Sequence, residues 1–365
     1  MLMTLLKHVK NKNLKPMSLK HFSHLISWSR SQYFQLPWRS QRTLYRTLVS
    51  EIMLQQTTVG TVLNHFEKFL TEYPSIFDLA ASSEEQVCIS WKGLGYYRRA
   101  RSLRGIAIGI VEQFNGEIPT NIDDLRKLKG IGPYTANAIV AIGADLRGLA
   151  LDANLERVLS RYYGVKVLKG PKLQQKLFSD FNAKKIMKEM DVLSPRDLNE
   201  ALMDLGRVLC QARKASCLLC PLKEKCVAFK SEKPLSFPVE AKKDKKNDFF
   251  IKVVRIVVKE KNKILFYQKN TNEWLSGQWE LPTFIFDTND EALSQYPRIK
   301  IKKTFLDGVM IKTGITKYSI ENYIVEMSLE DFQKISKKFN REYVFKISNS
   351  QLNLSTTSLK VLKKI

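Results

Sequence analysis

The spacing of apolar residues divides the chain into a helical first part and a strand-rich second part. Pro37 disfavours a helical Leu36, so residues 36–39 are predicted to form an extended corner. Apolar residues recur at helical spacing over residues 21–31, 44–54, 59–70, 155–163 and 196–209. Runs typical of strands follow at residues 249–258, 263–268 and 318–327. The pattern predicts a mainly α N-terminal part and an α+β C-terminal domain.

One stretch between these parts lacks any apolar period. Residues 233–248, KPLSFPVEAKKDKKND, combine prolines with many lysines, as interdomain linkers do. This composition predicts a first domain at residues 1–232 and a second at residues 249–365. A chain of 365 residues is long enough to give each domain its own core.

Basic residues outnumber acidic residues along the whole chain. Lys and Arg total 60 against 36 Asp and Glu, a formal net charge of +24. A surplus of this size favours a polyanionic partner such as nucleic acid, although solubility alone also explains a basic protein. Binding that depends on this charge should weaken steeply as salt rises.

Neither the start of the chain nor its interior resembles a membrane segment. The apolar run within the first 15 residues is too short for a signal peptide, and its positive charge lies on the wrong side. No later stretch approaches the ~18 uninterrupted apolar residues of a membrane span. We expect a monomer that acts in the cytoplasm, associated with the nucleoid if its source is bacterial, and not at a membrane.

A glycine-rich turn separates two short helices in the middle of the chain. A helix capped at residue 120 or 121 is broken by Gly130, Gly132 and Pro133, and a second apolar helix follows from Thr135. Backbone N–H groups at such a turn point outward and suit a phosphate. We predict a contact with a DNA backbone there; a plain corner between two helices is the alternative.

Two carboxyl groups stand in positions suited to acid and anion chemistry. Glu51 lies among Val49, Ile52 and other apolar residues of a predicted helix, where burial raises a pKa toward the range of a general acid at neutral pH. Asp152 stands at the head of the helix predicted at residues 155–163, and the dipole of that helix favours the charged form of Asp152. The plainer alternatives are a glutamate at the rim of a core helix and a simple N-cap.

Four of the five cysteines form a cluster, while Cys88 stands alone in an apolar context that predicts a buried thiol. In a reducing compartment such clustering favours a metal centre over disulfides. Zinc sites usually pair two C-x2-C knuckles or add histidines, and the four histidines lie far away in sequence. Four thiolates also suit a [4Fe–4S] cluster. The C-x6-C-x2-C-x5-C spacing belongs to Cys210, Cys217, Cys220 and Cys226.

Several motifs carry a resemblance to a known family. The segments LKGIGPYT at residues 128–135 and LDANLERVLSR at residues 151–161 resemble the helix-hairpin-helix and catalytic-aspartate segments of the endonuclease III superfamily of DNA glycosylases, and so does the cysteine spacing. Within it, LPWR, SEIMLQQTTV, GLGYY and WLSGQWELP are similar to the MutY family of adenine DNA glycosylases. The resemblance extends over nearly the whole chain. It implies a helix-hairpin-helix glycosylase core with a [4Fe–4S] cluster loop, followed by a Nudix-like recognition domain.

The resemblance also implies catalytic roles. Glu51 would protonate N7 of adenine and then activate water, while Asp152 would stabilise the oxocarbenium ion, oriented by Asn154 and Tyr134. Strand-cleaving relatives place a Schiff-base lysine at the position of Tyr134, and a tyrosine cannot form that bond. The chain therefore looks like a monofunctional glycosylase.

Further residues would meet the DNA. Gln56 and Thr57 would lie near the base opposite the extruded one, Leu94 would approach that base, and Tyr96 would wedge into the stack. The cysteine cluster would hold a basic loop, with Arg213 and Lys214, against the DNA. Arg39 and Gln55 complete the predicted DNA contacts of the core. For Arg39 the alternative is a solvent-exposed arginine with no contact to DNA.

The C-terminal domain resembles a Nudix fold without its spaced metal-binding glutamates, which implies recognition and not a second hydrolase. In the family a Phe-Ser-His loop checks for 8-oxoguanine. The corresponding stretch here is Ile315-Thr316-Lys317, in which Thr316 keeps a hydroxyl while the other two residues depart from the pattern.

The implied function is base excision repair: flipping and excision of adenine opposite 8-oxoguanine or G in double-stranded DNA. Three alternatives remain open. A pyrimidine glycosylase with lyase activity shares the fold, a non-catalytic iron–sulfur DNA-binding protein shares the charge and the cysteines, and a Nudix hydrolase would act on free nucleotides.

Overall fold

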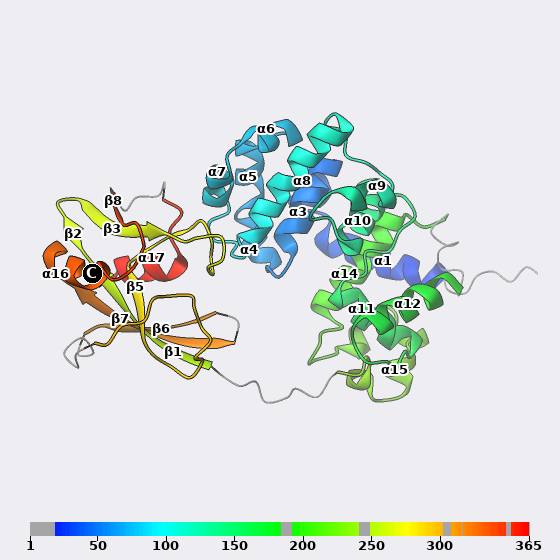
Figure 1. Ribbon diagram of the computed structural model, residues 1–365. Coiled ribbons are helices and arrows are strands. Elements are labelled where there is room, and N and C mark those ends of the chain that lie inside the picture. The colour runs from blue at the N-terminus through cyan, green and yellow to red at the C-terminus, as the bar shows by residue number, and fades with distance from the viewer. Residues whose placement is uncertain are drawn as a thin grey trace, which may run out of the picture. The chain divides into compact units, whose positions relative to one another are not determined.

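The computed structural model describes residues 19–183, 192–240, 249–301, 308–315, 317–347 and 352–364. The chain forms two compact units (Figure 1). Unit 1 comprises Met1–Ala81 and Ser102–Ala241, and unit 2 comprises Ser82–Arg101 and Lys242–Ile365. Within the described residues, no helix has both the length and the apolar character that a membrane crossing requires.

Unit 1 is built from helices packed around one main core. Phe22, Leu155, Leu159, Leu198 and Leu202 meet there, each 1% exposed or less. They come from three helices, which are α1, α11 and α14. The helices of this unit are α1 (Leu19–Tyr33), α2 (Pro37–Ser40), α3 (Leu44–Leu54), α4 (Val59–Leu63), α5 (Phe66–Glu72), α6 (Ile76–Ala81), α9 (Ile122–Lys127), α10 (Pro133–Ala138), α11 (Ala153–Tyr163), α12 (Pro171–Ala183), α14 (Pro195–Val208) and α15 (Val227–Lys230).

Two local predictions for this unit were wrong. The single helix expected over residues 59–70 is two helices, because the chain leaves α4 at Asn64 and restarts after His65, whose ring bonds back to Thr61 O at 2.9 Å. The extended corner expected over residues 36–39 is extended only at Leu36. Pro37 instead occupies the first position of α2, where its missing N–H costs no hydrogen bond.

The glycine-rich turn joins α9 to α10 as predicted. Asn121 caps α9 by accepting a hydrogen bond from Asp124 N at 2.8 Å. Gly130 then takes a φ of +107°, and a Cβ there would lie 2.3 Å from Ser102 Oγ, so both the backbone and the space require glycine. After α10 the chain continues into a π-helical turn over Ile139–Gly143. The turn therefore places Tyr134 in the first turn of α10.

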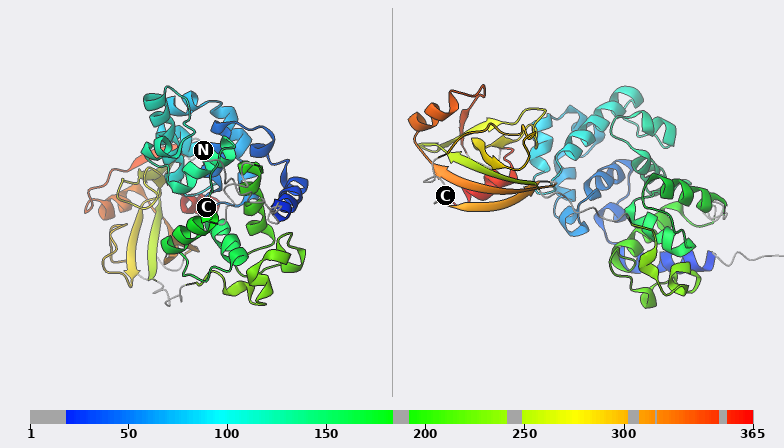
Figure 2. Two further views of the ribbon diagram at one scale, coloured as in Figure 1. Left: turned by 90° about the vertical axis from the view of Figure 1, so that its right-hand side faces the viewer. Right: turned by 60° about the horizontal axis from the view of Figure 1, so that its bottom comes forward.

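Unit 2 is α+β, as the strand-like runs predicted (Figures 1 and 2). One sheet has the order β5-β1-β7-β6, in which β1 and β7 are parallel, and the other has the order β2-β3-β4 with β8 paired to β3. Helix α8 (Arg98–Phe114) begins in this unit and continues in unit 1. The other elements are α7 (Glu84–Ser90), β1 (Phe249–Val257), β2 (Lys259–Glu260), β3 (Lys263–Gln268), β4 (Trp279–Glu280), β5 (Thr283–Thr288), β6 (Met310–Ile315), β7 (Tyr318–Glu326), α16 (Leu329–Ser336), β8 (Val344–Ile347) and α17 (Thr356–Leu362).

A buried charge network stabilises the β3–β4 end of unit 2. Glu280, 1% exposed, accepts hydrogen bonds from Arg255 Nη1 at 2.6 Å and from Lys269 Nζ at 2.8 Å. Burial alone would raise the pKa of Glu280, but the two cations outweigh it and bring that pKa to about 2. Removing one partner would leave an uncompensated buried charge, so this end of the sheet is held firmly.

The predicted linker begins later than its composition suggested. Val239 pairs with Leu168 in a parallel bridge, and Lys169 N donates to Val239 O at 2.9 Å. Arg161 Nε donates to Phe237 O at 3.1 Å. Residues 233–240 therefore pack on unit 1, and the boundary between units falls at residues 241 and 242.

Candidate active site

Helix α3 carries Glu51 on its buried face. Thr43 caps the helix by accepting a hydrogen bond from Arg46 N at 3.1 Å. The Glu51 side chain is 5% exposed. Tyr134 Oη, from α10, donates to Glu51 Oε2 at 2.5 Å. A core helix and the hairpin thus hold one carboxyl group between them.

The pKa of Glu51 is raised to about 7, mainly because the side chain is buried. The negative charges of Asp152 and Glu200 also raise this pKa, whereas the hydrogen bond from Tyr134 and the charge of Arg39 lower it. The carboxyl is therefore close to half protonated at neutral pH, which suits a general acid. The predicted upward shift is confirmed.

Asp152 caps helix α11. Its Oδ1 accepts hydrogen bonds from Asn154 N at 2.9 Å and Leu155 N at 2.7 Å, and its Oδ2 accepts one from Asn154 Nδ2 at 2.9 Å. The predicted cap is confirmed. Burial nevertheless raises the pKa of Asp152, against the lowering effect of these bonds and of Arg157. The net direction is opposite to that expected from the helix dipole alone.

Glu51 and Asp152 open onto one cavity of about 930 Å³ in unit 1. Its volume lies in the range of pockets that enclose a small ligand. Tyr134 and Asn154 line it as well, and so do Arg39, Gln55, Gln56 and Thr57. The structure therefore brings together the four predicted catalytic residues and four of the predicted DNA-binding residues.

Arg39 lies in a buried network and not on the surface, so the solvent-exposed alternative is wrong. The side chain is 7% exposed, Nη1 donates to Asp204 Oδ2 at 2.7 Å, and Nε lies 3.4 Å from Glu200 Oε2. Arg42 donates to both carboxylate oxygens of Glu200, at 2.6 and 2.8 Å. A contact between Arg39 and DNA stays a prediction.

Sequence reasoning missed the contribution of α14 to this cavity. Glu200, Met203, Asp204 and Arg207 all line it. The spacing of Glu200, Asp204 and Arg207 repeats every three or four residues, which places them on one helix face. The available signal was the spacing of Glu200 and Asp204, which places two carboxyl groups one turn apart on the same face of the predicted helix.

The polar turn after α3 lies at the edge of the same cavity. Gln55 Nε2 donates to Thr135 Oγ1 at 3.4 Å. Gln56 is exposed and has a φ of +56°, a conformation uncommon for a residue with a side chain. The turn thus presents the side chains of Gln56 and Thr57 beside the cavity.

The second turn predicted to contact DNA bases, residues 94–96, lies in unit 2. Tyr96 has a φ of +50° and is 62% exposed, whereas Leu94 is 5% exposed. Arg99 Nη2 donates to Leu94 O at 3.0 Å and to Gly95 O at 3.1 Å, and its guanidinium lies 5.6 Å from the centre of the Tyr96 ring. The exposed side chain at this turn is therefore Tyr96.

The four clustered cysteines line one small cavity of about 30 Å³ together with Arg161. Arg161 Nη1 donates to Cys210 Sγ at 3.2 Å and to Gln211 O at 2.8 Å. Tetrahedral zinc would bring its four sulfurs to about 3.8 Å from one another. In the described part of the chain, no three potential ligands are grouped tightly enough to hold a single ion. Four thiols that line one cavity could hold a metal ion or an iron–sulfur cluster.

The basic loop between the first two of these cysteines is closed at its base. Cys210 pairs with Ala215 in a bridge, and Ser216 N donates to Leu209 O at 2.9 Å. Arg213 and Lys214 are exposed on this loop. Cys88 belongs to unit 2 and is buried as predicted, and burial raises the pKa of its thiol to about 11.

Arg157 connects the cysteine segment to the active site. Its Nε donates to Cys210 O at 2.7 Å, and its Nη2 donates to Asn154 Oδ1 at 2.9 Å and Gly206 O at 2.7 Å. A Cβ on Gly206 would lie 2.8 Å from the Cβ of Asn154, so α14 and α11 approach closely there. Through Arg157, the Asn154 side chain that bonds to Asp152 is thus linked to the backbone of Cys210, one of the four clustered cysteines.

Two further residues, Gly132 and Thr316, were predicted to contact DNA. Gly132 has a φ of −88° and a Cβ there would meet no atom within 4 Å, so, unlike at Gly130, neither the backbone nor the space requires glycine. Thr316 lies outside the described residues.

Comparison with known proteins agrees with this geometry. Residues 49–202 match the HhH-GPD superfamily of base excision DNA repair proteins. This range contains Glu51, Tyr134, Asp152 and Asn154, so the fold and the site define a DNA glycosylase of base excision repair.

Closer relatives define the family. The chain is 34% identical over 281 residues to the adenine DNA glycosylase of Buchnera aphidicola subsp. Schizaphis graminum, covering 74% of this chain and 75% of that protein. It is 31% identical over 337 residues to that of Buchnera aphidicola subsp. Baizongia pistaciae, covering 90% and 92%. The chain belongs to the adenine DNA glycosylase family.

A solved structure shares the fold of the core. A thermostable thymine-DNA glycosylase matches with a TM-score of 0.50 and 25% identity, covering 57% of this chain and 95% of that chain. Because that protein is named for a different base, the common fold does not by itself select adenine.

Proposed function

We propose that this glycosylase flips adenine out of duplex DNA in which it faces 8-oxoguanine or G, and hydrolyses its glycosidic bond without cutting the strand. The observation that carries the proposal is the meeting of Glu51, Tyr134 and Asp152 in one cavity. An acid that is partly protonated at neutral pH and a second carboxyl group line the same cavity, as hydrolysis of a glycosidic bond requires.

The chemistry follows from the placement of protons and charges. Adenine leaves poorly until N7 is protonated, and Glu51, with its pKa near 7, supplies that proton. As the bond between adenine and the sugar breaks, positive charge develops on the sugar ring, and the Asp152 carboxylate stabilises this charge. Asn154 fixes Asp152 through the bond to Oδ2. Glu51, once deprotonated, accepts a proton from the attacking water.

Tyr134 supports hydrolysis over strand cleavage. A lyase needs an amine that attacks the sugar, and Tyr134 instead donates a hydrogen bond to Glu51. The position that would carry the amine is therefore occupied by a phenol that positions the acid.

The predicted DNA contacts surround this chemistry. Arg39, Gln55, Gln56 and Thr57 would lie beside the flipped base and its vacated space, because they line the cavity. Gly130 and Gly132 would face a phosphate at the hairpin, and Arg213 and Lys214 another. Leu94 and Tyr96 would act on the opposite strand, with the C-terminal unit as a Nudix-like domain that reads 8-oxoguanine through Thr316.

Cys210, Cys217, Cys220 and Cys226 would hold a [4Fe–4S] cluster. Such a cluster supplies four-point anchoring of the chain and a centre able to take up or release an electron. In this chain the anchoring fixes the loop that carries Arg213 and Lys214. Arg157 extends the same support to Asn154.

The opposite base should control the rate of adenine release. In single-turnover measurements on duplexes with A opposite 8-oxoguanine, G, C or T, we expect release opposite 8-oxoguanine and G to exceed release opposite C by at least about tenfold. Pyrimidine release, or equal rates on all four duplexes, would contradict the proposal. Borohydride treatment should trap no covalent adduct with DNA, because Tyr134 cannot form a Schiff base with the sugar. A trapped adduct would indicate a lyase.

The cysteines should bind iron and not zinc. The purified protein is expected to contain about four iron atoms per chain, and Cys220→Ser should lose most of them and weaken DNA binding, because one anchor of the basic loop is gone. Metal analysis and binding titrations check both effects. Cys88→Ser, the same substitution outside the cavity, should keep its iron. One zinc per chain and no iron would refute the cluster.

A further inference from the structure

The loop between β3 and β4, residues 269–278, contacts two segments of unit 2 that are far apart in sequence. One is the start of α8, at residues 97–101, and the other is the start of β7 at Tyr318. The WLSGQ residues of this loop take no part in the chemistry described above. Their contacts suggest a different task.

The second half of the loop holds the start of α8. Arg101 Nη1 donates to Ser276 O at 2.8 Å, and Gly277 lies close to the same guanidinium. The Gln278 side chain hydrogen-bonds to Tyr97. Tyr97 directly follows Tyr96 in sequence, so this contact lies beside the Leu94–Tyr96 turn.

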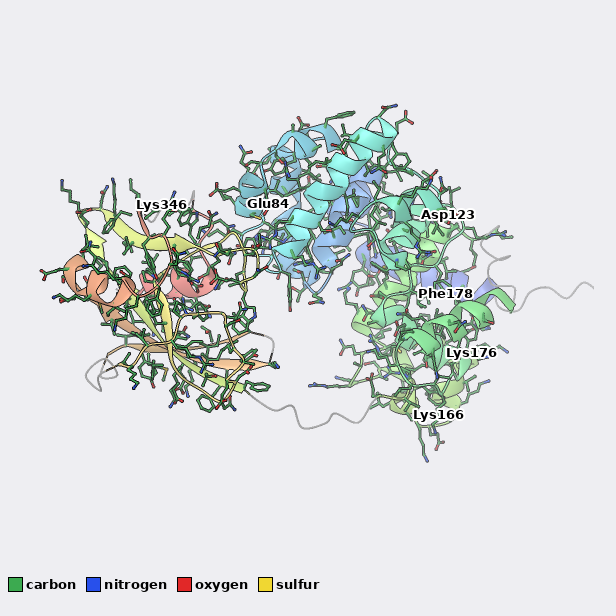
Figure 3. All side chains as sticks on the ribbon, viewed as in Figure 1. Glu84, Asp123, Lys166, Lys176, Phe178 and Lys346 are labelled. Carbon is green, nitrogen blue, oxygen red and sulfur yellow. The ribbon has the colours of Figure 1, made fainter. Side chains whose placement is uncertain are left out.

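Arg101 also ties this contact to α7. Its guanidinium hydrogen-bonds to the Cys88 thiol and lies 3.8 Å from Glu84 Oε1. Glu84 is the first residue of α7 (Figure 3). One side chain thus joins α7, α8 and the β3–β4 loop.

The first half of the loop supports the β6–β7 turn. The Trp274 ring packs 4.9 Å from the Tyr318 ring, centroid to centroid, and Trp274 N donates to Gln295 Oε1 at 2.5 Å. Tyr318 pairs with Ile315 across the end of β6 and β7, and Lys317 Nζ lies 5.4 Å from the centre of the Tyr318 ring. Trp274 therefore packs on Tyr318, the first residue of β7, which follows the stretch that the family resemblance assigns to 8-oxoguanine.

The loop is rigid enough to link the two sites. Lys269 N donates to Gln278 O at 2.9 Å, Gly277 N donates to Lys269 O at 2.8 Å, and the Lys269 ammonium is buried against Glu280. These bonds fix the two ends of the loop against each other, so a displacement at one end is transmitted to the other.

We propose that the β3–β4 loop sets the spacing between the two turns that read the base opposite adenine, and that Arg101 is the positioning residue that joins them. The inference rests on the proposed function. Arg99, two residues before Arg101, holds the carbonyls of Leu94 and Gly95, so a shift at Arg101 reaches the Leu94–Tyr96 turn directly. Recognition of the opposite base then depends on a residue that needs no contact with DNA.

The test compares two rates in one variant. Arg101→Ala should lower the ratio of single-turnover adenine release opposite 8-oxoguanine to that opposite G by about fivefold or more, while adenine is still excised. Arg98→Ala is the matched control, because Arg98 is exposed in the same helical turn and carries the same charge. Its loss should weaken binding to both duplexes alike and leave the ratio unchanged.

A second variant separates coupling from damage. Trp274→Ala removes the support at the other end of the loop. The double variant Arg101→Ala/Trp274→Ala should lower the ratio of release opposite 8-oxoguanine to release opposite G no further than the more affected single variant does, because both substitutions break the same linkage. Thermal unfolding identifies a variant that fails to fold, in which case Arg101→Lys and Trp274→Phe replace the alanine pair. Additive effects, or an unchanged ratio in Arg101→Ala, overturn this inference alone. Equal wild-type rates opposite 8-oxoguanine and G likewise overturn this inference alone, whereas equal rates on all four duplexes overturn the proposed function and this inference with it.

Discussion

Glu51→Gln is expected to reduce adenine release by about a thousandfold at neutral pH, because an amide cannot donate the proton that N7 requires. The substitution keeps the size of the side chain, so the cavity and its bond with Tyr134 remain largely intact. Single-turnover release of adenine, with DNA binding measured in parallel, separates lost chemistry from lost affinity. Near-normal release at neutral pH would exclude Glu51 as the acid.

The pH dependence of the wild type gives a second check on the same residue. Glu51 donates only when protonated, and its pKa near 7 lies well above the ordinary glutamate range. The rate should therefore hold below pH 7 and fall about tenfold per pH unit above it. Glu67→Gln, an exposed glutamate on α5 outside the cavity, should keep the wild-type rate and profile.

Asp152→Asn is expected to lower adenine release by about a hundredfold to a thousandfold, because the group that balances the positive sugar is no longer an anion. Asparagine caps helices about as well as aspartate, so α11 should remain formed. Single-turnover release and thermal unfolding measure the two effects separately.

The matched control for Asp152 is Asp123→Asn. Asp123 is exposed in the first turn of α9 (Figure 3), so it undergoes the same substitution at a helix start outside the cavity. It should keep nearly all of the wild-type rate. If Asp152→Asn also kept full release with an intact fold, the carboxylate would have no role at the sugar.

The local features of the active site could be predicted because they depend on neighbours in sequence. Apolar residues around Glu51 indicated its burial and its raised pKa. The position of Asp152 before a helix indicated the cap. Gly130 and Gly132 indicated the hairpin that carries Tyr134.

Features that depend on distant partners could not be predicted in the same way. Arg39 meets Asp204, which lies 165 residues further on, so no local pattern signals that it is buried. The pKa of Asp152 is raised because unit 1 buries it, an effect that opposes the helix start read from sequence. The grouping of Ser82–Arg101 with the C-terminal strands depends likewise on contacts such as Arg101 with Ser276.

The close approach at Gly206 bears on any attempt to engineer base preference. Met203 lines the cavity one helical turn earlier, so randomising it would reshape the pocket that receives the base. Gly206 has no such freedom, since even a methyl group there would push into Asn154. A directed-evolution library on α14 should therefore diversify position 203 and keep position 206 fixed.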